Sequence, residues 1–83
     1  MLFAEERRDY NMTDGEIIKA VRIQLGLSQQ KFAKEMHVAF STVNRWENGR
    51  TIPNGMARAL LSDYMSKNGI CEEWIKMIEN EKS

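Results

Sequence analysis

Apolar residues in the first part of this 83-residue chain recur every three or four positions, which is the spacing of one face of an α-helix. Thr13 and Glu16 stand at the spacing of a capping box, in which each side chain bonds the backbone N–H of the other. Gly26 suits the position just after a helix end. The pattern therefore predicts a first helix between Thr13 and Gly26, with an apolar face formed by Ile17, Ile18, Val21 and Leu25.

Two shorter helices joined by a tight turn are predicted over residues 28–48. Ser28 is a good N-cap for the first of them, whose apolar side is formed by Phe32, Ala33 and Met36. After a turn at residues 37–39, the second runs from about residue 40 to residue 48, with a core face of Val43, Trp46 and the stem of Glu47. Its opposite face is polar and partly aromatic, and consists of Phe40, Ser41, Asn44, Arg45 and Asn48. This division of faces suits a helix-turn-helix that reads DNA.

Two further helices are predicted after residue 52. Pro53 suits the first position of a helix that Asn68 and Gly69 terminate. The expected buried stripe of this helix consists of Met56, Leu60 and Tyr64. The last helix extends from about residue 71 to residue 80, and its apolar residues are Ile70, Trp74, Ile75, Met77 and Ile78. We expect Trp74 to pack on the domain's own core and the outer edge of this helix to form a dimer contact.

The whole chain is therefore predicted to be all-α, with five helices around one small core. Residues 1–12 show no clear periodicity and are assigned to a flexible N-terminal arm. Residues 13–69 form the principal domain, and residues 70–83 form a C-terminal amphipathic helix and tail. No repeat or low-complexity tract interrupts this organisation.

The stretch over residues 27–50 resembles the repressor/Cro-type, or XRE-like, helix-turn-helix family. The resemblance rests on Leu-Ser-Gln at residues 27–29 and Trp-Glu-Asn-Gly at residues 46–49, and it extends over about residues 17–61. It implies a five-helix lambda-repressor-like domain that binds duplex DNA sequence-specifically, as a homodimer, and represses transcription at an operator. It implies no cofactor.

Residues 53–61 are similar to antitoxin regulators of the host-inhibition type, in which a related Pro-x-x-x-Ala-Arg-Ala-Leu-Leu follows the motif. This similarity gives an alternative, an antitoxin that binds a toxin partner through its tail or arm and autoregulates its operon. A DNA-targeting module of a larger protein is a second alternative. A protein-interaction domain that has lost DNA binding is a third, and the basic residues Arg45 and Arg50 argue against it.

The exposed face of the second short helix is expected to contact bases through Phe40, Ser41, Asn44 and Arg45. Arginine can bond O6 and N7 of guanine, and asparagine N6 and N7 of adenine, each through two hydrogen bonds. Phe40 has two alternatives, contact with a thymine methyl group or packing on the turn. Ser41 also has two, a hydrogen bond to a base or one to a phosphate. Phosphate contacts, which fix register without reading bases, are assigned to Gln29, Asn48 and Arg50.

The resemblance also implies an ion pair between Arg22 and Glu47 with a structural role. Two nearby positions depart from the family pattern. His37 stands where glycine is usual, and a left-handed backbone there costs a residue with a side chain about 1 kcal/mol or more. Ala39 stands where serine or threonine commonly caps the second short helix. The N–H groups of residues 40–42 then lack a side-chain acceptor and are available to a phosphate oxygen.

The charge is balanced overall but not along the chain. Twelve Lys and Arg residues oppose twelve Asp and Glu residues, which by itself gives no sign of a nucleic-acid partner. The segment 13–69, however, is basic, whereas the tail from residue 70 is acidic. A modest basic excess predicts weak non-specific DNA binding by a monomer, because that affinity scales with the number of phosphates neutralised.

Other function classes find little support in the sequence. Cys71 is the chain's one cysteine, so it forms no internal disulfide and suits a reducing, cytoplasmic setting. His37 has no carboxylate or thiol at a motif spacing, and we assign no catalytic residue. Neither residue has the partners that a metal site requires. No apolar run approaches the length of about 18 residues that a membrane-spanning helix needs.

Overall fold

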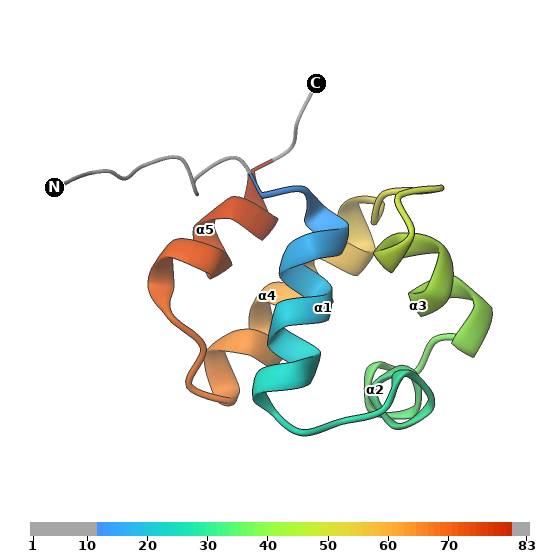
Figure 1. The fold of residues 1–83 in the computed structure, drawn as a ribbon. Coiled ribbons are helices and arrows are strands. Elements are labelled where there is room, and N and C mark those ends of the chain that lie inside the picture. The colour runs from blue at the N-terminus through green and yellow to red at the C-terminus, as the bar shows by residue number, and fades with distance from the viewer. Residues whose placement is uncertain (1–11, 81–83) are drawn as a thin grey trace, which may run out of the picture.

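The computed structural model describes residues 12–80, and over this range the chain forms five α-helices and no strand (Figure 1). The helices are α1 (Asp14–Gln24), α2 (Gln29–Met36), α3 (Phe40–Glu47), α4 (Gly55–Lys67) and α5 (Glu72–Glu79). The predicted all-α, five-helix architecture is confirmed. The predicted arm at residues 1–12, apart from Met12, lies outside the described residues, as do residues 81–83 of the tail.

Helix α1 lies in the middle of the domain, with α5 on one side of it and α2 and α3 on the other (Figure 1). It packs against both α3 and α5, while α4 packs against α5 and α2. The core draws side chains from every helix, and its members are Ile17, Ile18, Val21, Phe32, Ala33, Met36, Val43, Trp46, Leu61, Met65, Ile70 and Ile78. The predicted apolar faces of α1, α2 and α3 are therefore confirmed. Trp74 is partly buried and packs against this core, as expected.

The helix ends follow from local side-chain chemistry. The capping box of α1 is present, with Glu16 N donating to Thr13 Oγ1 at 3.1 Å and Thr13 N donating to Glu16 Oε1 at 2.9 Å. Ser28 Oγ accepts from Lys31 N at 3.0 Å and caps α2. His37 ends α2 in the left-handed region at φ 62°, which is the departure from glycine that the sequence indicated.

The start and the buried stripe of α4 differ from the sequence prediction. Asn54, not Pro53, opens the helix, because its Oδ1 accepts from Ala57 N at 2.9 Å. The predicted buried stripe is wrong at two positions, since Met56 is 76% exposed and Leu60 48% exposed. The residues of α4 that are buried instead are Arg58, Leu61 and Met65. The prediction is wrong because the observed stripe includes an arginine, and polarity alone assigns arginine to the surface.

Arg58 is buried in an ion pair that joins three helices. Its Nη2 donates to Asp14 Oδ2 at 2.7 Å, and its Nη1 donates to the backbone carbonyl of Ile78 at 2.9 Å. Both charged side chains are about 5% exposed or less. The contact fastens the start of α1 and the end of α5 to α4.

Tyr64 connects α4 to α2 through a partly exposed hydrogen bond. Its hydroxyl donates to Glu35 Oε1 at 2.7 Å, and its ring meets Phe32 edge-on with centroids 5.5 Å apart. Partial burial, together with this hydrogen bond and the charge of Glu35, raises the pKa of Tyr64 from 10.0 to about 12. The folded state therefore holds the phenol proton more tightly than the unfolded chain does.

This pKa shift predicts an alkaline loss of stability in a defined window. The contribution of Tyr64 is fully present below pH 10, and it is lost as the pH rises towards about 12, because the unfolded chain releases the proton first. We expect a spectrophotometric titration to show a phenolate component near pH 12 that Tyr64→Phe removes. A component that persists in Tyr64→Phe would contradict the assignment.

Gly15 allows α1 to approach α3 closely. A Cβ atom at this position would lie 2.1 Å from the carbonyl oxygen of Trp46, which is a backbone atom. We expect Gly15→Ala to lower the free energy of unfolding by about 1 to 3 kcal/mol, because the two helices must move apart. Gly55→Ala, where a Cβ meets open space at an ordinary φ, is the matched control and should be neutral or slightly stabilising in the same urea titration. Equal stability of both variants would contradict the close approach.

Candidate nucleic-acid interface

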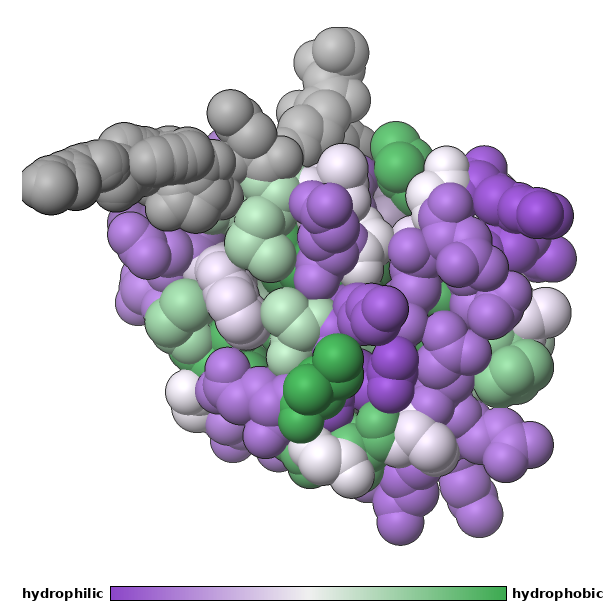
Figure 2. Space-filling model, viewed as in Figure 1, coloured by the Kyte–Doolittle hydropathy of each residue, from purple (hydrophilic) through white to green (hydrophobic). Residues whose placement is uncertain are grey.

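Helix α3 divides its residues between core and surface as its sequence predicts. Val43 and Trp46 are buried, whereas the opposite face is exposed except for the half-buried Asn44. Hydrophilic side chains gather over the side of the molecule that carries α2 and α3, in contrast to the mixed surface over α1 and α5 (Figure 2). The predicted base-contacting residues thus share one face, and they are Phe40, Ser41, Asn44 and Arg45. Their contacts with bases stay predictions.

The start of α3 has no side-chain cap, as Ala39 in the sequence indicates. One of the three backbone donors expected to be free is nevertheless bonded, since Thr42 N donates to Ala39 O at 3.0 Å. The N–H groups of Phe40 and Ser41 begin the helix and have no intrahelical acceptor. They are the two donors that remain for an anion at this end of α3.

The predicted pair of Arg22 and Glu47 is confirmed and holds α3 against α1. Arg22 Nε donates to Glu47 Oε2 at 2.7 Å, and Arg22 Nη2 donates to Glu47 Oε1 at 3.0 Å. A third donor, Arg22 Nη1, reaches the carbonyl of Leu27 at 2.9 Å. The hydrogen bond and charge of Glu47 raise the pKa of Arg22, against the opposing effect of burial. The Glu47 side chain is only 3% exposed, so this pair fixes the orientation of α3.

Three amide side chains that the sequence assigned to DNA contacts are bonded to one another. Gln29 Nε2 donates to Glu47 Oε1 at 2.9 Å, and Gln29 Oε1 accepts from Asn44 Nδ2 at 3.2 Å. Asn48 Nδ2 then donates to Asn44 Oδ1 at 3.1 Å. The sequence predicts these residues as independent contacts, because two of the three bonds join positions 15 and 18 residues apart, which no local pattern indicates. Only the bond from Asn48 to Asn44 has the local spacing of four residues on one helix.

The basic side chains divide between the core and the surface. Arg22 and Arg58 are committed to their ion pairs, and Lys67 Nζ lies 3.1 Å from Asp63 Oδ2 on the exposed surface of α4. Four exposed basic residues remain on α2, on α3 and just after it, and they are Lys31, Lys34, Arg45 and Arg50. The excess positive charge therefore lies on the side of the molecule that carries the predicted contacts.

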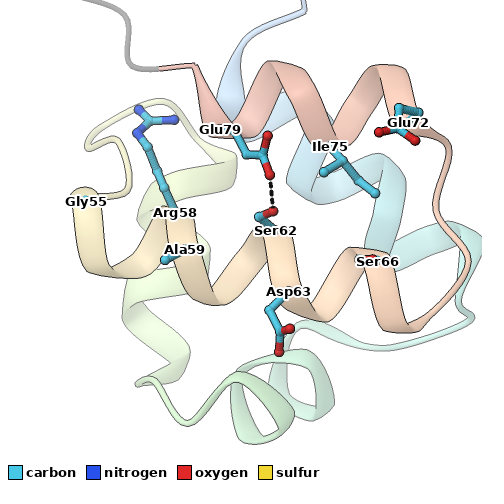
Figure 3. Close-up of a pocket in the computed structure, with 9 residues that line it drawn as sticks. All are labelled: Gly55, Arg58, Ala59, Ser62, Asp63, Ser66, Glu72, Ile75 and Glu79. Carbon is cyan, nitrogen blue, oxygen red and sulfur yellow. Dashed lines mark hydrogen bonds between the residues drawn. The ribbon is translucent and has the colours of Figure 1, made fainter.

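A groove of about 720 Å³ lies between α4 and α5, away from these residues (Figure 3). Ser62 Oγ donates to Glu79 Oε2 at 2.6 Å across it. None of the predicted DNA-contacting residues lines the groove.

Nowhere in residues 12–80 do three or more His, Cys, Asp or Glu side chains gather as metal ligands would. No helix in the same range is long and apolar enough to cross a membrane.

Comparisons with known proteins agree with this geometry. A family model described as helix-turn-helix matches residues 18–65, which include α2, α3 and most of α1 and α4. The chain is 38% identical over 53 residues to Antitoxin HigA-2 of Vibrio cholerae, and the match covers 64% of this chain and 50% of that relative. The chain thus spans half the length of the curated relative. No solved structure matches the chain.

Proposed function

Because this chain belongs to the helix-turn-helix family, we propose that it binds duplex DNA sequence-specifically through α3 and regulates transcription by occupying an operator. The observation that carries the proposal is the exposed polar face of α3, held in place by the partly buried pair of Arg22 and Glu47. Such a helix fits the width of the major groove, where each base pair has its own pattern of donors and acceptors. In this proposal the protein acts in the cytoplasm by binding, without catalysis and without a cofactor.

Selection from a randomised duplex library tests this function, and two arginine variants separate base from phosphate contacts. Arg45→Ala should weaken binding to the selected operator by about 1 to 3 kcal/mol and relax the preference at one or two base pairs, because a base contact is lost. Arg50→Ala, the matched control on the same surface, should weaken binding to all duplexes alike and lower the salt slope by about one unit. Identical profiles for Arg45→Ala and the wild type would refute base reading by this residue.

We propose a homodimer as the DNA-binding form. The large apolar residues of α5 are buried or half-buried, so we place the interface near α4 and not at the outer edge of α5, where the sequence predicts it. Apolar side chains are left exposed at four-residue intervals before and along α4, where Ile52 is 61%, Met56 76% and Leu60 48% exposed. Met56 and Leu60 lie four residues apart on α4 and so share a face, and exposed apolar residues on one face favour an interface. Two-fold pairing would present two α3 helices to half-sites about 34 Å apart. Sedimentation of the purified protein tests the pairing, and a monomer at concentrations that protect an operator would exclude it.

The similarity to a protein named as an antitoxin supports a second function, in which this chain also neutralises a toxin and autoregulates the operon of the pair. The acidic residues of the C-terminal segment, among them Glu72, Glu73 and Glu79, offer a surface of opposite charge to the α2 and α3 side. Co-expression with the product of the adjacent gene tests this function. Growth arrest by that product alone, relieved by this chain, supports it, and unrelieved arrest excludes it.

A further inference from the structure

The three bonded amides form a relay that starts at the Glu47 carboxylate. The relay runs from Glu47 to Gln29, from Gln29 to Asn44 and from Asn44 to Asn48, with donor–acceptor distances of 2.9, 3.2 and 3.1 Å. It therefore connects the partly buried ion pair of Arg22 and Glu47, through Gln29 of α2, to the exposed face of α3. Gln29 is the member that joins the core carboxylate to a predicted base-contacting residue.

The carboxylate fixes the direction of every bond in the relay. An ionised carboxylate only accepts hydrogen bonds, and Arg22 holds this one through two nitrogen atoms. Gln29 must therefore turn its NH₂ group towards Glu47 and its oxygen towards Asn44. Asn44 must then turn its NH₂ group towards Gln29, which leaves its oxygen to accept from Asn48. No amide in the series can flip without placing two donors or two acceptors face to face.

This order determines what Asn44 presents to DNA. Each amide has two N–H donors and two acceptor sites, so Asn44 keeps one of each after its bonds to Gln29 and Asn48. One donor and one acceptor are what the N7 and N6 groups of adenine require, whereas guanine presents two acceptors, N7 and O6. An asparagine outside such a relay turns about a broad, roughly two-fold torsion and loses this fixed order.

We propose that Gln29 is a positioning residue that sets the donor and acceptor order of Asn44, and thereby the preference for adenine over guanine at one base pair, without touching that base. The inference rests on the proposed DNA-binding function. It extends the role predicted for Gln29, because the second N–H on its Nε2 is still available to a phosphate oxygen.

The test compares Gln29→Met with Gln30→Met. Methionine is close to glutamine in size and carries no amide, so the first variant breaks the relay and leaves Arg22 and Glu47 paired. Gln30 is the exposed neighbour on the same helix and provides the control. Thermal unfolding establishes that both variants are folded. The first readout is the set of side-chain amide resonances of Asn44 and Asn48 in the free protein. The second is the base preference recovered from a randomised duplex library.

In Gln29→Met we expect the Asn44 and Asn48 amide resonances to shift and their protons to exchange faster with water. The preference for adenine at the base pair that Asn44 contacts should fall about tenfold, within the range for loss of one bidentate contact. Gln30→Met should change neither readout. Unchanged resonances, or a uniform loss of affinity with the preference intact, would overturn the positioning role alone. Failure of the wild-type protein to select any duplex would overturn the proposed function together with this role.

Discussion

Replacing Arg58 with alanine should lower the free energy of unfolding by about 3 to 5 kcal/mol, which is a large share of the 5 to 15 kcal/mol that stabilises a small domain. The reason is that the variant strands a negative charge in the core. Asp14 Oδ2 loses the donor at 2.7 Å, its Oδ1 already has no partner, and the carbonyl of Ile78 loses its side-chain donor as well. Water reaches neither group easily, because the Asp14 side chain is 4% exposed.

Urea denaturation followed by circular dichroism measures this loss. Lys67→Ala is the matched control, because it removes a charged partner from the exposed pair with Asp63 and should change stability by only a few tenths of a kcal/mol. The double variant Asp14→Leu, Arg58→Met should recover most of the lost stability, since it removes both charges and keeps apolar volume. A loss below about 1 kcal/mol for Arg58→Ala would mean that water solvates Asp14 in the folded protein.

Replacing Glu47 with alanine should cost a similar amount, about 3 to 5 kcal/mol, because Arg22 is left charged at the interface of α1 and α3. Arg22 keeps one bond, to the carbonyl of Leu27, but loses both bonds to the carboxylate. The same carboxylate accepts from Gln29, so this substitution also frees the amide relay. The sequence analysis assigns Glu47 a structural role alone. The structure adds a second role, because the Glu47 carboxylate is connected to the predicted DNA-facing residues.

The effects of Glu47→Ala on stability and on DNA selection can be separated. Chemical denaturation gives the first, and Glu47→Gln, which keeps the size and an acceptor, should lose less stability than Glu47→Ala. Library selection at a temperature where the variant is folded gives the second. Stability equal to that of the wild type would show that the pair with Arg22 contributes nothing, as exposed pairs often do.

Local sequence signals predicted the ends and faces of α1, α2 and α3. Thr13, Ser28 and Gly26 act on residues only a few positions away, so their roles can be read without knowing the tertiary structure. The pair of Arg22 and Glu47 came from the family resemblance, because it joins residues 25 positions apart. The exposed face of α3 followed from helical periodicity and is the best-predicted part of the candidate site.

Features that depend on tertiary contacts could not be predicted from the sequence. The predicted stripe of α4 includes the exposed residues Met56 and Leu60 and omits Arg58. Arg58 can be buried because it pairs with Asp14, which lies 44 residues earlier in the chain, and no local pattern indicates this partner. Gly15 carries no sign of its role, since the atom that excludes a side chain belongs to the end of α3. The amide relay likewise exists only once α2 and α3 are packed together.

The central position of α1 has a consequence for how the domain folds. This one helix of 11 residues makes ion pairs with partners 25 and 44 positions further along the chain, so both lie in segments that are synthesised later. Neither half of the domain can complete its contacts while α1 is detached, and we expect a single cooperative unfolding transition with no stable fragment. During synthesis, α1 can therefore pair with Glu47 once α3 has been made, but Asp14 has no partner for its charge until Arg58 follows.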